Sequence, residues 1–113
     1  MKIGFIGIGL MGFPMAKNLL LKKIDLKVFS RTLEKAKPLE EFGAILTNSL
    51  SDVVEGVDIV ITMLTDDNAV ENVLGDKEFL ANIEPLSTVI DMSSIKPKTA
   101  IKYGKLFKKK KVN

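Results

Sequence analysis

One stretch near the start of the chain limits its possible folds more than any other. The apolar run of residues 3–6 has the length of a buried strand, and Gly7, Gly9 and Gly12 follow it in the spacing G-x-G-x-x-G. Apolar residues then recur at helical spacing, namely Met11, Met15, Ala16, Leu19 and Leu20. A strand, a glycine turn and a helix in this order are typical of a dinucleotide-binding unit, whereas the glycine spacing alone also occurs in ordinary α/β turns.

Each glycine has a separate physical role in such a unit. Gly7 permits the tight turn after the strand, Gly9 lets the backbone approach a pyrophosphate, and Gly12 lets the helix pack close to the strand. Backbone N–H groups without partners at the start of the helix then face the phosphates. We therefore predict cofactor contacts from the backbone of this segment, at Gly7, Gly9, Leu10, Met11 and Gly12.

The composition excludes several other kinds of site. The chain of 113 residues has the size of one domain, and it contains no cysteine and no histidine. Disulfides, thiolate metal sites and histidine-based catalysis are therefore excluded, and a zinc site is disfavoured. No apolar run approaches the roughly 18 residues that cross a bilayer, and strand-like sequence begins by Ile3. We expect no membrane span, no signal peptide and a cytoplasmic location.

The basic charge of the chain is concentrated near residue 110. The formal net charge is +3, and the lysines at 108–111 supply four positive charges, which leaves −1 on the rest. We therefore expect a nearly neutral dinucleotide-binding domain over residues 1–107 and a solvated, lysine-rich tail over residues 108–113. Nucleic-acid binding needs a basic stripe across the fold, so we expect none. Binding through the tail would instead show a steep salt dependence that is lost when the lysines are deleted.

The order of strand-like and helix-like segments predicts the fold. Strands are expected at residues 3–6, 24–29, 44–46, 57–64 and 88–91. Helices are expected after Gly12, at residues 33–42, 50–55, 67–74 and 79–83, and from Pro97 onward. This alternation predicts an α/β fold, a Rossmann-type doubly wound parallel sheet with strand order 3-2-1-4-5.

Local signals refine these elements and place the ligand. Pro38 is expected to kink or split the second helix, Gly43 to end it, and Ser49 to cap the third helix. Ligands of doubly wound sheets bind beyond the carboxyl ends of the strands. Four loops are expected to meet there, at residues 7–12, 30–32, 63–67 and 91–96.

The loop after the second strand indicates which dinucleotide binds. Rossmann domains that prefer NAD usually have an acidic residue there, which binds the ribose 2′-hydroxyl. This chain has Ser30, Arg31 and Thr32 instead, and arginine offers a planar set of donors that matches a 2′-phosphate. The sequence therefore predicts NADP(H) in preference to NAD(H), with NAD(H) as the second possibility. The alternative is that Arg31 is only a solvated residue at the start of a helix.

Four segments together carry a family resemblance. They read GFIGIGLMGFPMAKNL at residues 4–19, FSRT at 29–32, ITMLTDD at 61–67 and DMSSIKP at 91–97. These segments resemble the N-terminal domain of the β-hydroxyacid dehydrogenases, which include 3-hydroxyisobutyrate dehydrogenase and 6-phosphogluconate dehydrogenase. Two positions depart from the family pattern: Ser30 stands in place of asparagine, and Thr65 in place of a common proline.

The resemblance implies roles for further residues. Met63 and Leu64 are expected to run along the cofactor, Ser94 to lie near its nicotinamide end, and Ser93 to approach the substrate side. Core packing is the alternative for Met63 and Leu64, and helix capping is the alternative for the two serines. Asp91 is expected to be structural, and no residue of the chain is assigned a catalytic role.

Parts of the resembled family find no match in this sequence. These are a sixth strand, a glycine-rich substrate loop, and an all-helical domain with the catalytic lysine. We therefore expect a cofactor-binding fragment, inactive alone, whose parent oxidises a short 3-hydroxy acid or reduces the matching semialdehyde. The alternative is a non-catalytic dinucleotide-binding or interaction module that is complete at this length. In a fragment without the sixth strand, the fifth strand leaves an apolar parallel sheet edge, which predicts homo-oligomers.

Overall fold

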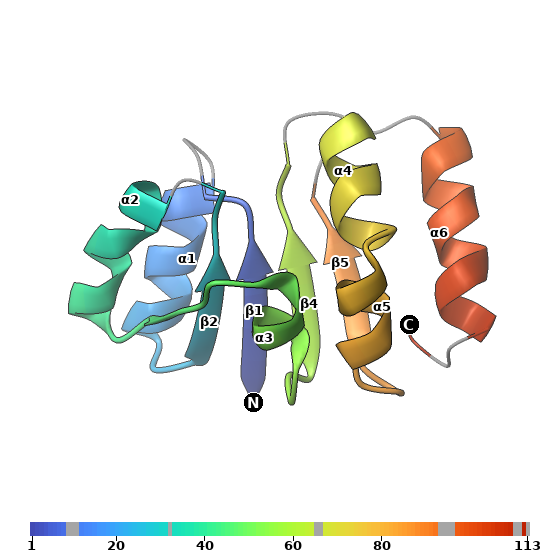
Figure 1. Ribbon diagram of the computed structural model, residues 1–113. Helices are drawn as coiled ribbons and strands as arrows, with labels where there is room; N and C mark the ends of the chain where they lie inside the picture. The colour runs from blue at the N-terminus through green and yellow to red at the C-terminus, as the bar shows by residue number, and fades with distance from the viewer. Residues whose placement is uncertain (9–11, 32, 65–66, 93–96, 110–111, 113) are drawn as a thin grey trace.

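The computed structural model describes residues 1–8, 12–31, 33–64, 67–92, 97–109 and 112. Within these residues the chain forms one five-stranded sheet in which all strand pairs are parallel (Figure 1). The strands are β1 (Lys2–Ile6), β2 (Asp25–Phe29), β3 (Ile45–Leu46), β4 (Ile59–Thr62) and β5 (Thr88–Asp91). Their order, β3-β2-β1-β4-β5, confirms the predicted doubly wound Rossmann-type topology.

The register of the sheet brings four strand ends level with one another. Ile6 at the end of β1 pairs with Phe29 of β2 and Thr62 of β4, and Thr62 pairs with Asp91 of β5. In a parallel sheet the loops that follow these residues therefore leave from the same edge. This edge is where the sequence places the ligand.

The central strands follow the pattern expected of a sheet that is covered on both faces. Val60, Ile61 and Thr62 of β4 are all buried. This strand is shorter than the predicted 57–64, although backbone hydrogen bonds continue on both sides of it. The Asp58 N–H donates to the Lys2 carbonyl at 2.9 Å, and the Met63 N–H donates to the Ile6 carbonyl at 2.9 Å.

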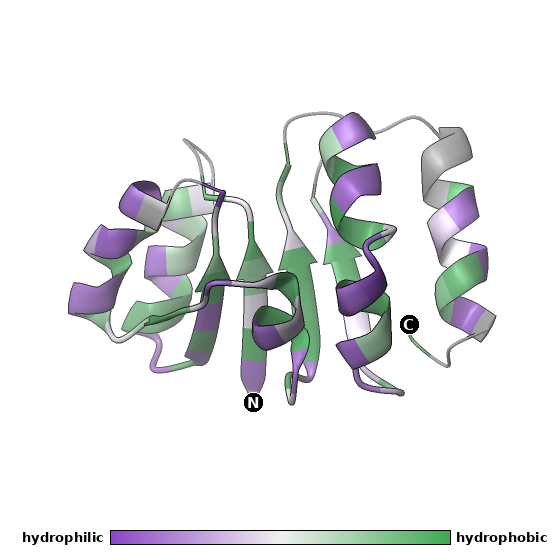
Figure 2. Cartoon of the chain, in the orientation of Figure 1, coloured by the Kyte–Doolittle hydropathy of each residue, from purple (hydrophilic) through white to green (hydrophobic). Residues whose placement is uncertain are grey.

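Helices cover the two faces of the sheet in separate groups (Figure 1). One apolar core joins the sheet to α1 (Gly12–Leu21), α2 (Leu33–Ala36) and the 3₁₀ helix η1 (Lys37–Phe42). The other core joins it to α3 (Leu50–Val54), α4 (Asp67–Leu74), α5 (Lys77–Asn82) and α6 (Pro97–Lys109). Figure 2 shows the consequence, a mostly hydrophobic sheet between helices with hydrophilic outer surfaces.

Local signals in the sequence account for several helix boundaries. The predicted helix 33–42 is split into α2 and η1, with Pro38 in the first turn of η1, and Gly43 ends η1 at a φ of 100°. The Ser49 side chain accepts from the Asp52 N–H at the start of α3, as predicted. The structure starts α5 two residues before the predicted 79–83, because the Asp76 carboxylate caps it, a signal that the sequence analysis missed.

The last helix packs by its aromatic residues. Tyr103 and Phe107 are buried, and the Phe107 ring lies 6.3 Å from the ring of Phe79 on α5. Ile101, an apolar residue on the same helix, is 59% exposed. Helix α6 extends into the segment predicted as a lysine-rich tail, and Val112 is buried with its N–H donating to the Phe107 carbonyl at 2.8 Å. Among the described residues, none of the helices has the length and apolar character needed to span a membrane.

Candidate functional site

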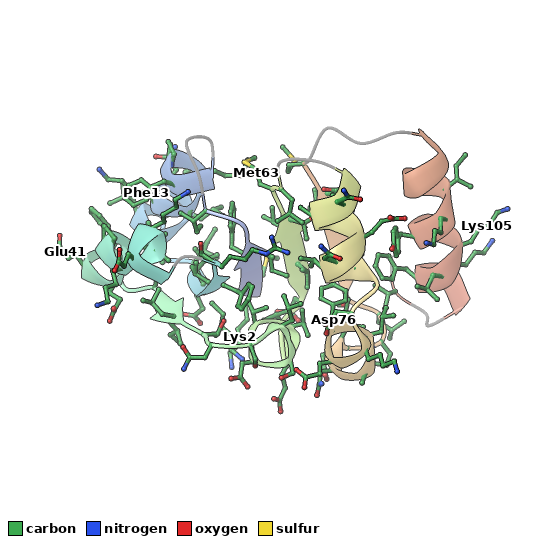
Figure 3. All side chains as sticks on the ribbon, turned by 45° about the horizontal axis from the view of Figure 1, so that its top comes forward. Lys2, Phe13, Glu41, Met63, Asp76 and Lys105 are labelled. Atoms are coloured by element: carbon green, nitrogen blue, oxygen red, sulfur yellow. The ribbon has the colours of Figure 1, made fainter. Side chains whose placement is uncertain are left out.

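A pocket of about 490 Å³ opens at the carboxyl ends of β1, β2 and β4. Figure 3 is tilted so that this edge of the sheet comes forward, with Met63 labelled after β4 and Asp76 labelled after α4. The residues that line the pocket come from the strand ends, from the loops after them, from α2, α3 and α4, and from the turn after α4. They are Ile6, Gly7, Ile8, Phe29, Ser30, Arg31, Lys35, Leu50, Met63, Leu64, Ala69, Asn72, Val73 and Asp76.

Gly7 forms the floor of the pocket, where three strands meet. Its N–H donates to the Phe29 carbonyl at 3.0 Å, and its φ is +98°, a conformation that residues with a side chain rarely adopt. A Cβ at this position would overlap the carbonyl oxygen of Met63 and would lie 3.0 Å from a methyl carbon of Leu64. The positive φ and the backbone of the loop after β4 therefore both require glycine at the tight turn that the sequence predicts.

Gly12 acts behind the pocket rather than in its wall. It is buried at the start of α1, and a Cβ there would lie 2.6 Å from the Gly7 carbonyl oxygen and 3.4 Å from the Phe5 ring. The absence of a side chain thus lets α1 pack against the end of β1, which is the role that the sequence analysis gives to this glycine.

The β2 side of the pocket carries its positive charge. Ser30, Arg31 and Lys35 all line this wall, and no acidic residue lines the same wall among the residues that the structure describes. Arg31 and Lys35 are both exposed, and neither forms an ion pair with another described residue. Lys35, in the single turn of α2, is a lining residue that no motif in the sequence predicts.

The β4 side of the pocket is apolar near the strand. Met63 and Leu64 line it and are half-buried. Each of them also packs against a core, Met63 on the α1 side of the sheet and Leu64 on the α4 side. Both residues therefore pack against the core and also face the pocket, the position from which they are predicted to contact the cofactor.

Asp91 has a structural contact. The Thr62 hydroxyl donates to one of its carboxylate oxygens at 2.9 Å, and Thr62 itself is fully buried. This bond links β4 to β5 at the same level as the pocket floor. It agrees with the structural role that the sequence analysis gives to Asp91.

The structure thus brings together five of the predicted site residues, Gly7, Ser30, Arg31, Met63 and Leu64. Gly12, the sixth predicted residue that the structure describes, lies behind the pocket. The remaining predicted residues lie outside the described part of the chain, namely Gly9, Leu10, Met11, Thr32, Ser93 and Ser94. Beyond Lys35, the sequence analysis also missed Asn72 and Asp76 on the far wall. In the part of the chain that the structure describes, no group of acidic residues is placed to hold a metal ion.

Comparisons with known proteins agree with this arrangement. Residues 2–113 match the family model of the NAD-binding domain of 6-phosphogluconate dehydrogenase. A probable mitochondrial 3-hydroxyisobutyrate dehydrogenase-like protein of Arabidopsis thaliana is 36% identical over 85% of this chain and 30% of its own length. An NAD-dependent L-serine dehydrogenase of Pseudomonas aeruginosa is 41% identical over 89% of this chain and 34% of its own length.

A solved structure extends the comparison to three dimensions. The 3-hydroxyisobutyrate dehydrogenase of Mycobacterium tuberculosis, determined with L-serine, superposes with a TM-score of 0.91 at 29% sequence identity. The match covers 98% of this chain and 38% of that chain, so this chain spans about a third of the length of the relatives that it matches. The parallel sheet, the pocket at its carboxyl edge and these matches lead to one conclusion. The chain belongs to the family of the NAD-binding domain of 6-phosphogluconate dehydrogenase, with 3-hydroxyisobutyrate dehydrogenases among its homologues.

Proposed function

We propose that the pocket binds NADP(H), with the pyrophosphate over the Gly7–Gly12 turn and the adenosine ribose at the end of β2. The observation that carries this proposal is the shared lining of the pocket by Gly7, Arg31 and Lys35. A 2′-phosphate carries negative charge and acceptor oxygens, and the Arg31 guanidinium offers it several donors. Lys35 adds a second positive charge at the same wall, and Ser30 adds a hydroxyl.

The rest of the cofactor follows the wall of β4 in this proposal. Met63 and Leu64 give the apolar surface along which it extends, and the backbone of Gly9, Leu10 and Met11 donates to its phosphates. Thr32 assists Arg31, and Ser94 lies at the nicotinamide end with Ser93 on the substrate side. The nicotinamide, when bound, supplies hydride transfer, and the chain's own residues hold it and keep water away from it.

The reaction of the whole protein is a further part of the proposal. Its relatives include 3-hydroxyisobutyrate dehydrogenase-like proteins, which favours oxidation of a short 3-hydroxy acid or reduction of the matching semialdehyde. A general acid or base must reach the substrate by a hydrogen bond. The described residues that line the nicotinamide side of the pocket, such as Met63 and Leu64, cannot exchange a proton in this way. We therefore expect this chain alone to bind cofactor without turning over substrate. We also expect the protein to be located in the cytoplasm.

Calorimetric titration with NADPH and NADH tests the proposal. We expect the chain to bind NADPH more tightly than NADH. Arg31→Ala should weaken NADPH binding about tenfold or more, because hydrogen bonds to a charged group are worth about 1.5–3 kcal/mol. NADH binding should change much less, since it lacks the 2′-phosphate.

The control removes a positive charge elsewhere. Lys22 is exposed just after α1 and does not line the pocket, so Lys22→Ala should leave the NADPH affinity unchanged. Equal affinities of the unmodified chain for NADPH and NADH would refute the preference. An Arg31→Ala variant that binds NADPH normally would refute the role of the guanidinium.

A further inference from the structure

The far wall of the pocket has a polar end, from which we infer that the chain selects adenine by its exocyclic amino group, through Asp76 and Asn72. This inference rests on the proposed dinucleotide function and adds a base preference to it. Both residues line the pocket together with Arg31, and neither is needed to explain the phosphate contacts.

The residues of this wall lie on one side of α4 and its C-terminal turn. Ala69, Asn72 and Val73 are spaced three and four residues apart on α4, which places them on one helical face, and Asp76 follows in the turn between α4 and α5. Val73 is buried and Ala69 half-buried, whereas Asn72 is exposed. The most buried residue of this wall is therefore apolar, and its most exposed residue is polar.

The shape of the pocket places a base against this wall. A pyrophosphate over Gly7 and a ribose at Ser30 direct the base away from the strand ends, into the space between β2 and α4. Phe29, Leu50 and Val73 line this space and give apolar surface against which a flat ring can pack. The edge of the ring then meets the polar end, at Asn72 and Asp76.

Asp76 has one oxygen to offer to that edge. Its Oδ1 atom accepts from the N–H groups of Glu78 at 2.9 Å and Phe79 at 3.0 Å, which caps α5. Its Oδ2 atom forms no hydrogen bond with the described residues, and the side chain is half-buried. An ionised carboxylate only accepts hydrogen bonds, so it favours the amino group at position 6 of adenine. It disfavours hypoxanthine and guanine, which have an acceptor oxygen at that position.

Asn72 completes the recognition of the ring edge. Its side-chain amide has both donors and an acceptor, and it makes no hydrogen bond with the described residues. The amide N–H can donate to a ring nitrogen of adenine, beside the amino group whose N–H donates to the Asp76 carboxylate. The Asn72 donor and the Asp76 acceptor together match the ring nitrogen and the amino group of adenine. They do not match hypoxanthine, which has an oxygen in place of the amino group.

The test compares NADPH with its hypoxanthine analogue, reduced nicotinamide hypoxanthine dinucleotide phosphate, by calorimetric titration. We expect the unmodified chain to bind NADPH about tenfold more tightly than the analogue. Asp76→Asn should abolish or reverse this preference, because the new amide group donates where the carboxylate accepted. Asparagine caps helices about as well as aspartate, so the start of α5 should be retained.

Two further variants make the result decisive. Asp58→Asn removes the same charge beside Lys2, at the opposite end of the sheet, and should keep the tenfold preference. Asn72→Ala leaves the α5 cap untouched and should lower the preference at least threefold, so it decides the question if Asp76→Asn does not fold.

Each outcome has a distinct meaning. The base selection is overturned if the unmodified chain binds the two nucleotides equally. It is also overturned if the preference is unchanged in a folded Asp76→Asn variant or in Asn72→Ala. In these cases the dinucleotide function still stands. Binding of neither nucleotide overturns the proposed function itself, and the base selection with it.

Discussion

The two halves of the sheet differ in how completely their apolar side chains are covered. On β1 and β2, Phe5, Leu26 and Val28 are 1% exposed or less. On β5, which has β4 as its one strand neighbour among the described residues, Ile90 is 40% exposed, and the adjacent Met92 is 49% exposed. Ile61 on β4, which pairs with Ile90, is 9% exposed, so its exposed fraction lies between those of the two halves.

The well-covered half of the sheet is the half that carries the pocket, whereas the exposed apolar residues lie on β5, away from the pocket. The pocket is built on β1, β2 and β4, and no residue of β5 lines it among those described. The half with the complete core thus supplies a rigid base for the pocket, as binding sites require. The apolar residues of β5 have no such role and remain available for packing.

A matched pair of substitutions should show the largest effect of this difference. Ile3 on β1 is 4% exposed and belongs to the core on the α1 side, whereas Ile90 has the same side chain at the open edge. Ile3→Ala should lower the free energy of unfolding by about 2–5 kcal/mol, because it leaves a buried cavity. Ile90→Ala should lower it by less than about 1 kcal/mol.

Urea unfolding followed by circular dichroism measures both variants. Equal losses of stability would mean that the face of β5 is as well covered in solution as β1 is. That result would remove the distinction between the two halves.

Self-association of the chain should show the next largest effect. We expect dimers or larger oligomers at high concentration, because an apolar strand edge promotes pairing with another chain. Ile90→Lys should shift the molecule toward the monomer, since charged side chains protect such edges. Ile101→Lys, at a 59% exposed position on α6, is the control and should leave association unchanged.

Sedimentation velocity at several concentrations distinguishes these cases. A chain that stays monomeric at the highest concentration would contradict the proposed edge association. An equal effect of both lysine substitutions would assign association to the general surface instead.

The smallest effect is expected at an exposed ion pair on the same half. The Lys102 ammonium lies 3.3 Å from the Glu71 carboxylate, which links α6 to α4, and its side chain is 61% exposed. The pKa of Lys102 is raised from its ordinary value of 10.5, first by the hydrogen bond to Glu71, then by the charge of Tyr103 and that of Glu71. Exposed pairs of this kind contribute little to stability.

The pH dependence gives this prediction its sign. A raised pKa means that the pair stabilises the fold below pH 10.5 and that this contribution is lost as the pH rises through the raised value. Lys102→Met should therefore have a slightly lower thermal midpoint than the unmodified chain at pH 9, and the difference should vanish well above pH 10.5. Lys105→Met, with no ion pair among the described residues, is the control. A large drop at pH 9 would show that the pair is worth more than its exposure implies.

The sequence predicts the fold more fully than it predicts the pocket. The strand 88–91 matches β5 at both ends, and Pro38, Gly43 and Ser49 act at the helix boundaries where local chemistry places them. These features depend on neighbouring residues, so a single sequence contains them. The predicted strand 57–64 is longer than β4, because its apolar pattern continues past the residues that pair.

The pocket residues that the sequence missed depend on contacts between distant segments. Lys35, Asn72 and Asp76 carry no motif, and each lies several residues beyond the strand that precedes it, within a helix or in the turn after one. The predicted residues Ser30, Arg31 and Leu64 directly follow strand ends, so the topology alone is enough to bring them together. A residue further along a helix needs the helix orientation as well.

The turn at Gly7 joins the pocket to the hydrogen-bond ladder of the sheet. Its N–H is bound to β2, and the Met63 carbonyl of the neighbouring loop fills the space of its absent side chain. At Gly7, the floor beneath a dinucleotide is therefore part of the sheet itself. Loss of ligand binding on heating should coincide with melting of the sheet, and a bound nucleotide should raise the melting temperature of the domain as a whole.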